Sequence, residues 1–514
     1  MMKRTISYIL IAAMLCGLCA ISGSSDAASK LKLAKKSVNV TVKESVKVKY
    51  TSAVKPKVTS KNKKIATAKV KAKNKKIVIT GVKKGKTKIV VKASGKTAYI
   101  KVTVKKNKTG TITSDPIVTA TAKPTIDPAV KEAIKSAGSY ATSVNSFSCK
   151  TFTKLKKDDG NTFASPFSLY MALAMLTNGA ENNTKTELLN TLGISDFNDW
   201  NNKAKALLNG SADDSVILNI ANAAWIGKID IPSENIDRDF IEPIKTYYNG
   251  EVKKNVDMAS QEFVNEVNHW ADEKTNGMIK EILDRPPGAD TAFVLANAVY
   301  FLGKWRAPFD SKSTYEKEFK GVKGNKKVSM MSKHNTSAKY FKDDRFAGVE
   351  LGYGDGTYVM DVLLSADESK TTGAVWNALS ADEQLKELEN FTSAGSKEIA
   401  TLEIPKFEME SSFEDELIAA MKNLGINDAF DVYKADFSKI GKRIVVDKIK
   451  QKAKVKVSEE GTEAAAVTVI VGKNATAVRP TEDKVEFIAD RPFIFVIRDT
   501  LSGMILFIGE VNDL

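Results

Sequence analysis

Few side chains in this sequence could perform covalent or metal chemistry. The 514 residues contain two histidines, His269 and His334, and three cysteines. No HExxH motif, CxxC motif or paired-histidine spacing occurs, so neither a zinc site nor a Ser-His-Asp hydrolase is expected. We expect His269 to lie in a helix and His334 in a loop. The sequence therefore predicts no metal, no cofactor and no enzymatic activity.

Cys149 is the only cysteine expected in the mature chain, because Cys16 and Cys19 lie within an N-terminal signal peptide, residues 1–28. An intramolecular disulfide is therefore excluded. A nucleophilic Cys149 would need one of the two histidines as its base, and nothing in the spacing positions either of them. We interpret Cys149 as a small buried apolar residue.

The segment EEGTEAAAVTVIVGKNATAVRP, residues 459–480, carries two conflicting structural preferences. Residues 463–466 have the composition of a helix, whereas residues 467–471 are a β-branched run that favours a strand. No proline occurs from 459 to 479, so every backbone N–H there is able to join a sheet. An alanine-rich surface loop would explain neither the β-branched run nor the missing proline.

The first 28 residues have the three-part composition of a secretory signal. Lys3 and Arg4 precede an apolar stretch from about Ile6 to Ile21, and small residues follow. This stretch is too short and wrongly flanked for a permanent membrane span. We expect the mature chain to be secreted and to remain extracellular or associated with a cell surface.

A lysine-rich segment follows the signal. Residues 30–110 contain 27 lysines, no arginine and one acidic residue, Glu44. Apolar and polar residues alternate with period two in several short runs, which predicts a small antiparallel β-sandwich over residues 30–106. The strands are expected near 38–42, 46–50, 76–80, 87–93 and 97–104. The pattern resembles bacterial immunoglobulin-like surface domains.

The charge of this segment indicates an anionic partner. Nucleic acid is not expected, because only Tyr50 and Tyr99 offer aromatic rings for stacking and the chain is exported. Anionic cell-wall polymer or mucin is the predicted partner, and a merely solvated lysine face is the alternative interpretation.

The remaining chain divides into a linker and one large region. Residues 107–128 are rich in Thr and Pro and predict a semi-extended linker. In residues 129–514, helical patterns come mostly first and strand patterns mostly later, which favours an α+β domain with large antiparallel sheets. One of the helices is expected over residues 263–283.

A series of motifs in residues 129–514 resembles the serpin family of serine protease inhibitors, nearly end to end. The resemblance implies the serpin fold, helices plus large antiparallel sheets, in a protein that acts as a monomer. The motifs are FASPFS (163–168), LANAVYFLGKW (295–305), IPKF (404–407), DRPFIF (490–495) and ILFIG (505–509).

The resemblance also explains the two preferences of residues 459–480. In the inhibitory members of the family, this stretch is first an exposed protease bait and then, once cleaved, a strand inside a sheet. Residues 461–474 are expected to insert, with the small side chains of Thr462, Ala464 and Ala466 on one face of the new strand. The implied hinge consists of Glu459, Glu460, Gly461, Thr462, Glu463, Ala464, Ala465 and Ala466.

The family's usual spacing from Glu459 places the cleaved bond between Ala475 and Thr476. A small residue before the bond suits a shallow protease pocket, so a covalent complex with an elastase-like serine protease is expected. The alternative function is that of a non-inhibitory surface adhesion or binding protein with the serpin domain as scaffold. Other residues that remain open as the bait are Val471, Lys473, Ala477 and Val478.

Opening of the sheet is expected to depend on a few further positions that match the family's motifs. Ordinary core packing is the alternative interpretation of each. Where relatives often read His-Lys-Ala, this chain has Gln451-Lys452-Ala453, so the hydrogen bonds beneath the sheet must be arranged differently. The predicted positions are Ser165, Ser168, Asn297, Trp305 and Gln451.

Overall fold

The computed structural model of the chain divides into two compact units, residues 1–120 and 121–514. The structure describes residues 31–33, 35, 37–41, 45–52, 54–71, 75–93, 96–105, 128–157, 160–208, 216–228, 232–462 and 485–514. The predicted signal and almost all of the predicted linker lie outside these residues.

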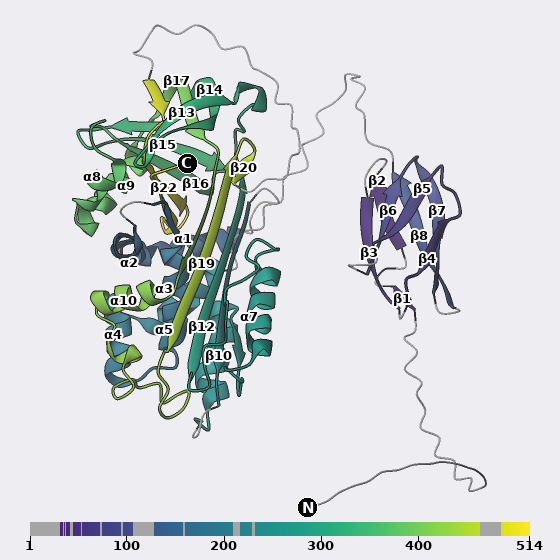
Figure 1. Cartoon of the computed structure of the whole chain (residues 1–514), viewed down its shortest axis with the longest axis horizontal. Coiled ribbons are helices and arrows are strands. Elements are labelled where there is room, and N and C mark those ends of the chain that lie inside the picture. The colour runs from purple at the N-terminus through teal and green to yellow at the C-terminus, as the bar shows by residue number, and fades with distance from the viewer. Residues whose placement is uncertain are drawn as a thin grey trace, which may run out of the picture. The chain divides into compact units, whose positions relative to one another are not determined.

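The smaller unit is built of strands alone in its described part. They form two four-stranded sheets, in the orders β1-β3-β6-β5 and β2-β8-β7-β4 (Figure 1). The strands are β1 (Lys32–Leu33), β2 (Ser37–Thr41), β3 (Ser45–Thr51), β4 (Lys57–Ser60), β5 (Ala66–Lys71), β6 (Lys76–Gly81), β7 (Gly85–Ala93) and β8 (Lys96–Lys105).

One apolar core lies within this unit and takes side chains from both sheets, among them Val48 and Ile79 of one sheet and Ile89 and Val102 of the other. The strands expected from the period-two pattern are confirmed. The prediction of a purely antiparallel arrangement is wrong, because β2 and β8 pair in parallel. Parallel neighbours need a long connection, and the five strands between β2 and β8 supply it.

The larger unit combines ten α-helices with two large sheets in its described part. The helices are α1 (Pro128–Ala137), α2 (Ala141–Leu155), α3 (Pro166–Thr177), α4 (Asn182–Leu192), α5 (Phe197–Leu208), α6 (Glu242–Tyr248), α7 (Gln261–Lys274), α8 (Thr372–Asn377), α9 (Ala381–Ser393) and α10 (Asp415–Leu424). Short 3-10 or π turns are η2 (Gly138–Tyr140), η3 (Asp237–Ile241), η4 (Ser311–Ser313) and η5 (Asp428–Phe430). None of the described helices is long and apolar enough to cross a membrane.

The first sheet has the strand order β11-β10-β12-β20-β19-β18 and runs the length of the unit (Figure 1). We call it the central sheet. Its strands are β10 (Val216–Ile226), β11 (Glu251–Lys253), β12 (Phe293–Lys304), β18 (Phe407–Phe413), β19 (Lys448–Ser458) and β20 (Gly461–Thr462).

The second sheet has the order β21-β17-β14-β15-β16-β22-β23-β9, with β13 paired to β14. Its strands are β9 (Thr162–Ala164), β13 (Tyr315–Gly321), β14 (Gly324–Lys342), β15 (Phe346–Tyr353), β16 (Tyr358–Ser365), β17 (Ser396–Pro405), β21 (Val485–Ile488), β22 (Phe493–Asp499) and β23 (Ile505–Val511).

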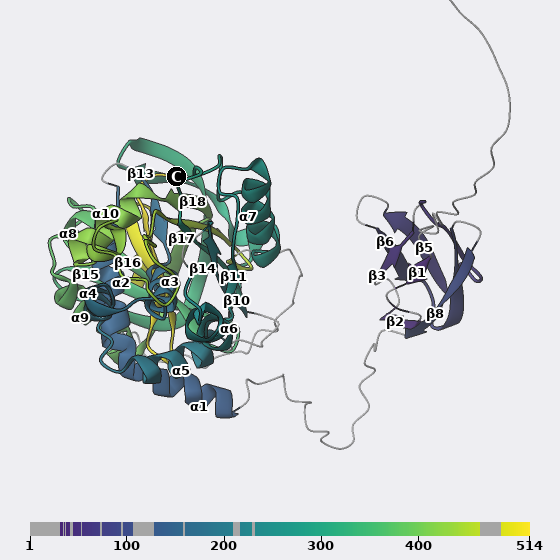
Figure 2. The ribbon, with the colours of Figure 1, turned by 90° about the horizontal axis from the view of Figure 1, so that it is seen from below.

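The central sheet is covered on both faces. Alternate residues of β12 point to opposite sides, so Val294 and Ala296 pack with α7 while Leu295 and Val299 join the main core beneath the sheet. Figure 2 shows α1, α5 and α6 lying together at the margin of the same unit.

The helix predicted over residues 263–283 is wrong in its second half, because α7 ends at Lys274. Asn276 and Gly277 adopt φ angles of 53° and 89°, which end the helix. The next segment is held by Asn268 on α7: its Oδ1 accepts hydrogen bonds from the N–H groups of Ile282 and Leu283 at 2.7 and 2.9 Å. Its Nδ2 donates to the carbonyl of Leu283 at 2.7 Å.

Asn268→Ala tests this arrangement. Three hydrogen bonds of a partly buried segment are lost, so the free energy of unfolding should fall by about 1–3 kcal/mol. Hydrogen exchange should accelerate first at the amides of Ile282 and Leu283. Unchanged exchange at these two amides would contradict the anchoring role of Asn268.

Candidate functional site

The central sheet contains a strand only two residues long between two of its longest strands. β12 and β19 pair in parallel where Val294–Val299 face Lys448–Ala453. Beyond this stretch they separate, and β20 pairs with both in antiparallel register, with Thr462 opposite Gly303 on one side and Val457 on the other. The candidate site is the gap between β12 and β19 that begins where β20 ends.

Thr462 is anchored by its side chain as well as by its backbone. It is fully buried, and its Oγ1 shares a hydrogen bond of 2.6 Å with the hydroxyl of Tyr353. The ring of Tyr353 in turn stacks on Trp305, with the ring centroids 4.4 Å apart. Burial raises the pKa of Tyr353 well above its usual value, so the phenol stays protonated.

Gly461 occupies a position that no other residue fits. Its φ of +148° is one that L side chains rarely adopt. A Cβ atom at this position would lie 2.1 Å from the carbonyl oxygen of Gly303. The chain therefore passes between β12 and β19 only because residue 461 has no side chain.

The turn before β20 is fixed by polar contacts. Glu459 forms an ion pair with Lys406 at 2.9 Å and accepts a hydrogen bond from Thr314 at 2.9 Å. Burial acts to raise the pKa of Glu459, but the hydrogen bonds from Lys406 and Thr314 outweigh it and hold that pKa below the usual value. Its backbone carbonyl accepts the N–H of Phe309 at 2.9 Å.

Trp305 lies directly against the same turn. Its backbone N–H donates to the carbonyl of Glu460, and its indole Nε1 donates to the carbonyl of Ser458, both at 2.9 Å. Predicted site residues Glu459, Glu460 and Trp305 are thus brought together with β20. The remaining predicted hinge residues Glu463, Ala464, Ala465 and Ala466, and the predicted bond between Ala475 and Thr476, lie outside the described residues.

A buried polar network lies beneath the parallel stretch of β12 and β19. Gln451 of β19 and Asn297 of β12 are opposite each other, and Nε2 of Gln451 donates to Oδ1 of Asn297 at 3.1 Å. The same Nε2 donates to the carbonyl of Ser165 at 2.9 Å, and Oε1 of Gln451 accepts the N–H of Ser165 at 3.2 Å. Gln451 thereby ties β19 both to β12 and to the start of α3.

Two further contacts complete the network. The hydroxyl of Ser168 donates to Oδ1 of Asn297 at 2.6 Å, and Nδ2 of Asn297 donates to Oδ1 of Asn222 at 2.8 Å. The hydroxyl of Ser165 accepts the N–H of Ser168 at the N-cap of α3 and donates to the carbonyl of Leu506. Separation of β12 from β19 must therefore break the contact between Gln451 and Asn297.

Four residues of this site were missed from the sequence: Tyr353, Lys406, Thr314 and Asn222. Lys406 lies inside a family motif, and Asn222 is a polar residue within an apolar strand, so both carried a signal that could have been used. Tyr353 and Thr314 carried none, because their partners are more than 100 residues away in the chain.

The other candidate residues lie elsewhere. Cys149 is buried in α2, and burial raises its pKa to about 12 against the opposing effect of Lys150, so it is not a ready nucleophile. His269 is on the exposed face of α7. His334 lies in β14, so the prediction of a loop is wrong; it is a residue in a long strand, next to Asn335, whose φ is 50°. Among the described residues, no group of three or more His, Cys, Asp or Glu side chains could hold a metal ion.

Comparison with known proteins gives one consistent family. The family model described as "Serpin (serine protease inhibitor)" matches residues 142–514. An uncharacterized serpin-like protein of Thermococcus kodakarensis is 32% identical over 379 residues, which cover 72% of this chain and 84% of that protein. The leukocyte elastase inhibitor of Sus scrofa is 32% identical over 369 residues, which cover 69% of this chain and 93% of that protein.

A solved structure agrees. The crystal structure of tengpin, a thermophilic serpin in its native state, matches with a TM-score of 0.64 and 27% identity, covering 78% of this chain and 98% of that one.

Gly461→Ala tests the tight passage of the chain between β12 and β19. The new methyl group must displace β20, which should lower the free energy of unfolding by about 1–3 kcal/mol. Hydrogen exchange should rise in peptides covering residues 301–305 and 456–462. Gly395→Ala is the matched control, because a Cβ there meets nothing within 4 Å. Equal exchange in both variants would contradict the packing described.

Gln451→Leu tests the network beneath the sheet. The leucine has a similar volume but cannot replace the hydrogen bonds to Ser165 and Asn297, so stability should fall by about 2–4 kcal/mol. Exchange should rise at the amides of 294–299 and 448–453. Gln384→Leu, which removes a buried glutamine elsewhere in the unit, should leave the exchange rates of these amides unchanged relative to the other amides of the unit. The same pattern in both variants would show that Gln451 has no special role in holding β12 to β19.

Proposed function

The chain belongs to the serpin family, and we propose that it is a secreted suicide inhibitor of serine proteases with elastase-like preference. Serpins are mostly protease inhibitors rather than enzymes, although some members do not inhibit. The observation that carries the proposal is β20: Gly461 and Thr462 already stand as the first two residues of a strand between β12 and β19.

The register of β20 supports insertion of the residues that follow it. Continued in the same antiparallel register, Gly472 would lie opposite Phe293, the first residue of β12. Val471 would lie opposite Lys448, the first residue of β19. The β-branched run from 467 to 471 would then gain hydrogen bonds on both sides, which is the environment that such residues favour. The sheet and the segment are matched in length.

The face that each inserted residue would present is also favourable. Thr462 is buried toward Tyr353, so Ala464 and Ala466 would follow it on the same face, and small side chains fit there without moving the core. Glu463 would point to the opposite face.

The proposed bait is the bond between Ala475 and Thr476. The protease serine Oγ attacks the carbonyl carbon of Ala475, the bond to the Thr476 nitrogen breaks, and that nitrogen leaves as an amine after taking a proton. An ester between Ala475 and the protease remains. Insertion then carries the tethered protease along and distorts its active site. Each oxyanion-hole donor that is lost slows hydrolysis of the ester by about 10²–10³.

The elastase-like preference rests on the small side chain of Ala475 and on similarity to the porcine leukocyte elastase inhibitor.

Purified mature protein mixed with an elastase-type protease should give a complex that survives denaturing gels, and a released peptide whose mass shows that it begins at Thr476. A different peptide start would move the bond to Val471, Lys473, Ala477 or Val478. Complete cleavage without complex would overturn the inhibitor proposal.

Thr462→Arg should convert the inhibitor into a substrate. Thr462 is already buried beside Tyr353 before cleavage, so an arginine there would place an unpaired charge in the core, displace the start of β20 and thereby oppose its extension. The fraction of protease trapped per cleavage should fall at least about tenfold, while Thr462→Ser, which keeps the hydroxyl, should inhibit normally. Retained stoichiometric inhibition by Thr462→Arg would contradict insertion past this position.

A second candidate function is adhesion through the lysine-rich unit, with anionic wall polymer or mucin as partner. Among the described residues, no lysine of this unit lies within 4 Å of a carboxylate, and many are exposed, including Lys47, Lys49, Lys88 and Lys101. Unpaired exposed cations favour a polyanion. Salt-sensitive retention of the full chain on a polyanionic polymer, absent on a neutral polymer, would support this role; equal retention on both would contradict it.

A further inference from the structure

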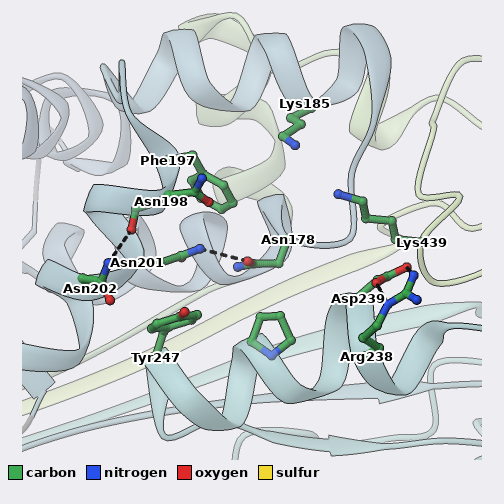
Figure 3. Close-up of a pocket in the computed structure, with 11 residues that line it drawn as sticks. Asn178, Lys185, Phe197, Asn198, Asn201, Asn202, Arg238, Asp239, Tyr247 and Lys439 are labelled. Atoms are coloured by element: carbon green, nitrogen blue, oxygen red, sulfur yellow. Dashed lines mark hydrogen bonds and ion pairs between the residues drawn. The ribbon is translucent and has the colours of Figure 1, made fainter.

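A cavity of about 360 Å³ lies in the larger unit, away from β20 and the network beneath the sheet. It is formed where α4, α5 and α6 meet the end of α3 and a loop that follows η5 (Figure 3). This volume is in the range of small-molecule sites. The lining residues are Asn178, Lys185, Phe197, Asn198, Asn201, Asn202, Arg238, Asp239, Pro243, Tyr247 and Lys439.

Cations outnumber carboxylates in this wall. Lys185, Arg238 and Lys439 line the cavity, and Asp239 is the one acidic residue among the lining residues. Figure 3 shows Lys185 and Lys439 extending their ammonium groups into the same space.

The acidic groups nearby are already committed. Arg238 holds Asp239 through two hydrogen bonds, Nε to Oδ1 at 2.6 Å and a terminal nitrogen to Oδ2 at 3.0 Å. Lys439 pairs with Glu181, just outside the lining, at 2.5 Å. These two pairs leave the charge of Lys185 uncompensated.

Lys185 has no carboxylate within 4 Å among the described residues; its Nζ lies 5.9 Å from the ring centre of Phe197. Burial lowers the pKa of Lys185, and the neighbouring Lys439 lowers it further, while Glu181 acts in the opposite direction. Two ammonium groups that face one space in this way form a site for an anion that bridges them.

The neutral part of the wall is fixed in place. Nδ2 of Asn201 donates to Oδ1 of Asn178 at 3.1 Å, and Oδ1 of Asn201 accepts the hydroxyl of Tyr248 at 2.6 Å. Both asparagines are buried. Phe197, Pro243 and Tyr247 supply apolar surface, and Asn198 and Asn202 add further polar groups. Such a wall is preorganised, so a ligand would lose little affinity in ordering it.

We propose that this cavity binds a small phosphate-bearing ligand, with Lys185 and Lys439 holding the phosphate. A phosphate offers several strong acceptor oxygens to two ammonium groups at once. The size of the cavity favours a small molecule over a polymer. An uncharged apolar ligand is disfavoured, because it would leave Lys185 desolvated and unpaired.

The test uses the full mature chain and titration calorimetry with three probes: inorganic phosphate, glucose 6-phosphate and glucose. Binding of glucose 6-phosphate more tightly than phosphate would identify a phosphate ester as the ligand class, and equal affinities would identify free phosphate. Glucose is expected not to bind. Binding should also raise the unfolding temperature, by an amount that grows roughly with the logarithm of ligand concentration above the dissociation constant.

Variants locate the site. Lys185→Ala and Lys439→Ala should each weaken binding of the phosphate probes by at least about tenfold, because each removes a charge-assisted contact. Lys245→Ala is the matched control, since Lys245 is an exposed lysine of α6 outside the lining and pairs with Glu242. It should bind as the parent does.

Asp239→Asn provides a gain of binding that a misfolded variant could not imitate. It removes the one carboxylate of the wall and frees Arg238, so affinity for phosphate should rise several-fold. The proposal is overturned if neither phosphate probe binds at millimolar concentration, or if Lys185→Ala and Lys439→Ala bind as tightly as the parent. The result of these binding measurements does not depend on whether the chain inhibits proteases.

Discussion

Two strands of the central sheet, β12 and β19, are neighbours along one part of their length and are held apart along the rest by two residues of a third strand. Backbone N–H and C=O groups on both sides of a buried gap must find partners. Gly461 and Thr462 satisfy them where β20 lies, and β12 and β19 satisfy each other over Val294–Val299 and Lys448–Ala453. An extended β20 would first fill the unpaired stretch between β12 and β19 and would then replace one set of hydrogen bonds with two where these strands now pair.

The other features of the site follow from this constraint. The glycine at 461 allows the chain to enter the gap. The stacked rings of Trp305 and Tyr353 lie at this entrance, where they contact Ser458 and Thr462. The ion pair of Glu459 with Lys406 fixes the turn from which the strand starts. Gln451 and Asn297 hold the lower part of β12 and β19 together. These contacts therefore fix the start of a strand and hold β12 and β19 together beyond it.

Much of this could be predicted from the sequence because the relevant signals are local. The absence of proline, the β-branched run and the small residues at alternate positions of 459–471 predict a strand that forms late, of which Gly461 and Thr462 are seen as β20. The family resemblance supplied Ser165, Ser168, Asn297, Trp305 and Gln451, although not their hydrogen bonds.

What could not be predicted depends on residues that are distant in the chain. Tyr353 meets Thr462 across 109 positions, and the early pairing of β20 requires the positions of β12 and β19 together. The end of α7 was missed because helical periodicity continues past Lys274, whereas Asn268 captures the next segment through its side chain. The lysine cavity is likewise assembled from separate segments, none of which has a recognisable motif.

The most direct test of the central claim is the thermal unfolding of the parent chain before and after a single cleavage in residues 472–478. If the freed segment extends β20 between β12 and β19, the new hydrogen bonds on both sides should raise the unfolding temperature of the larger unit by more than about 10 °C. An unfolding temperature that is unchanged or lowered by cleavage would contradict insertion and with it the proposed trap.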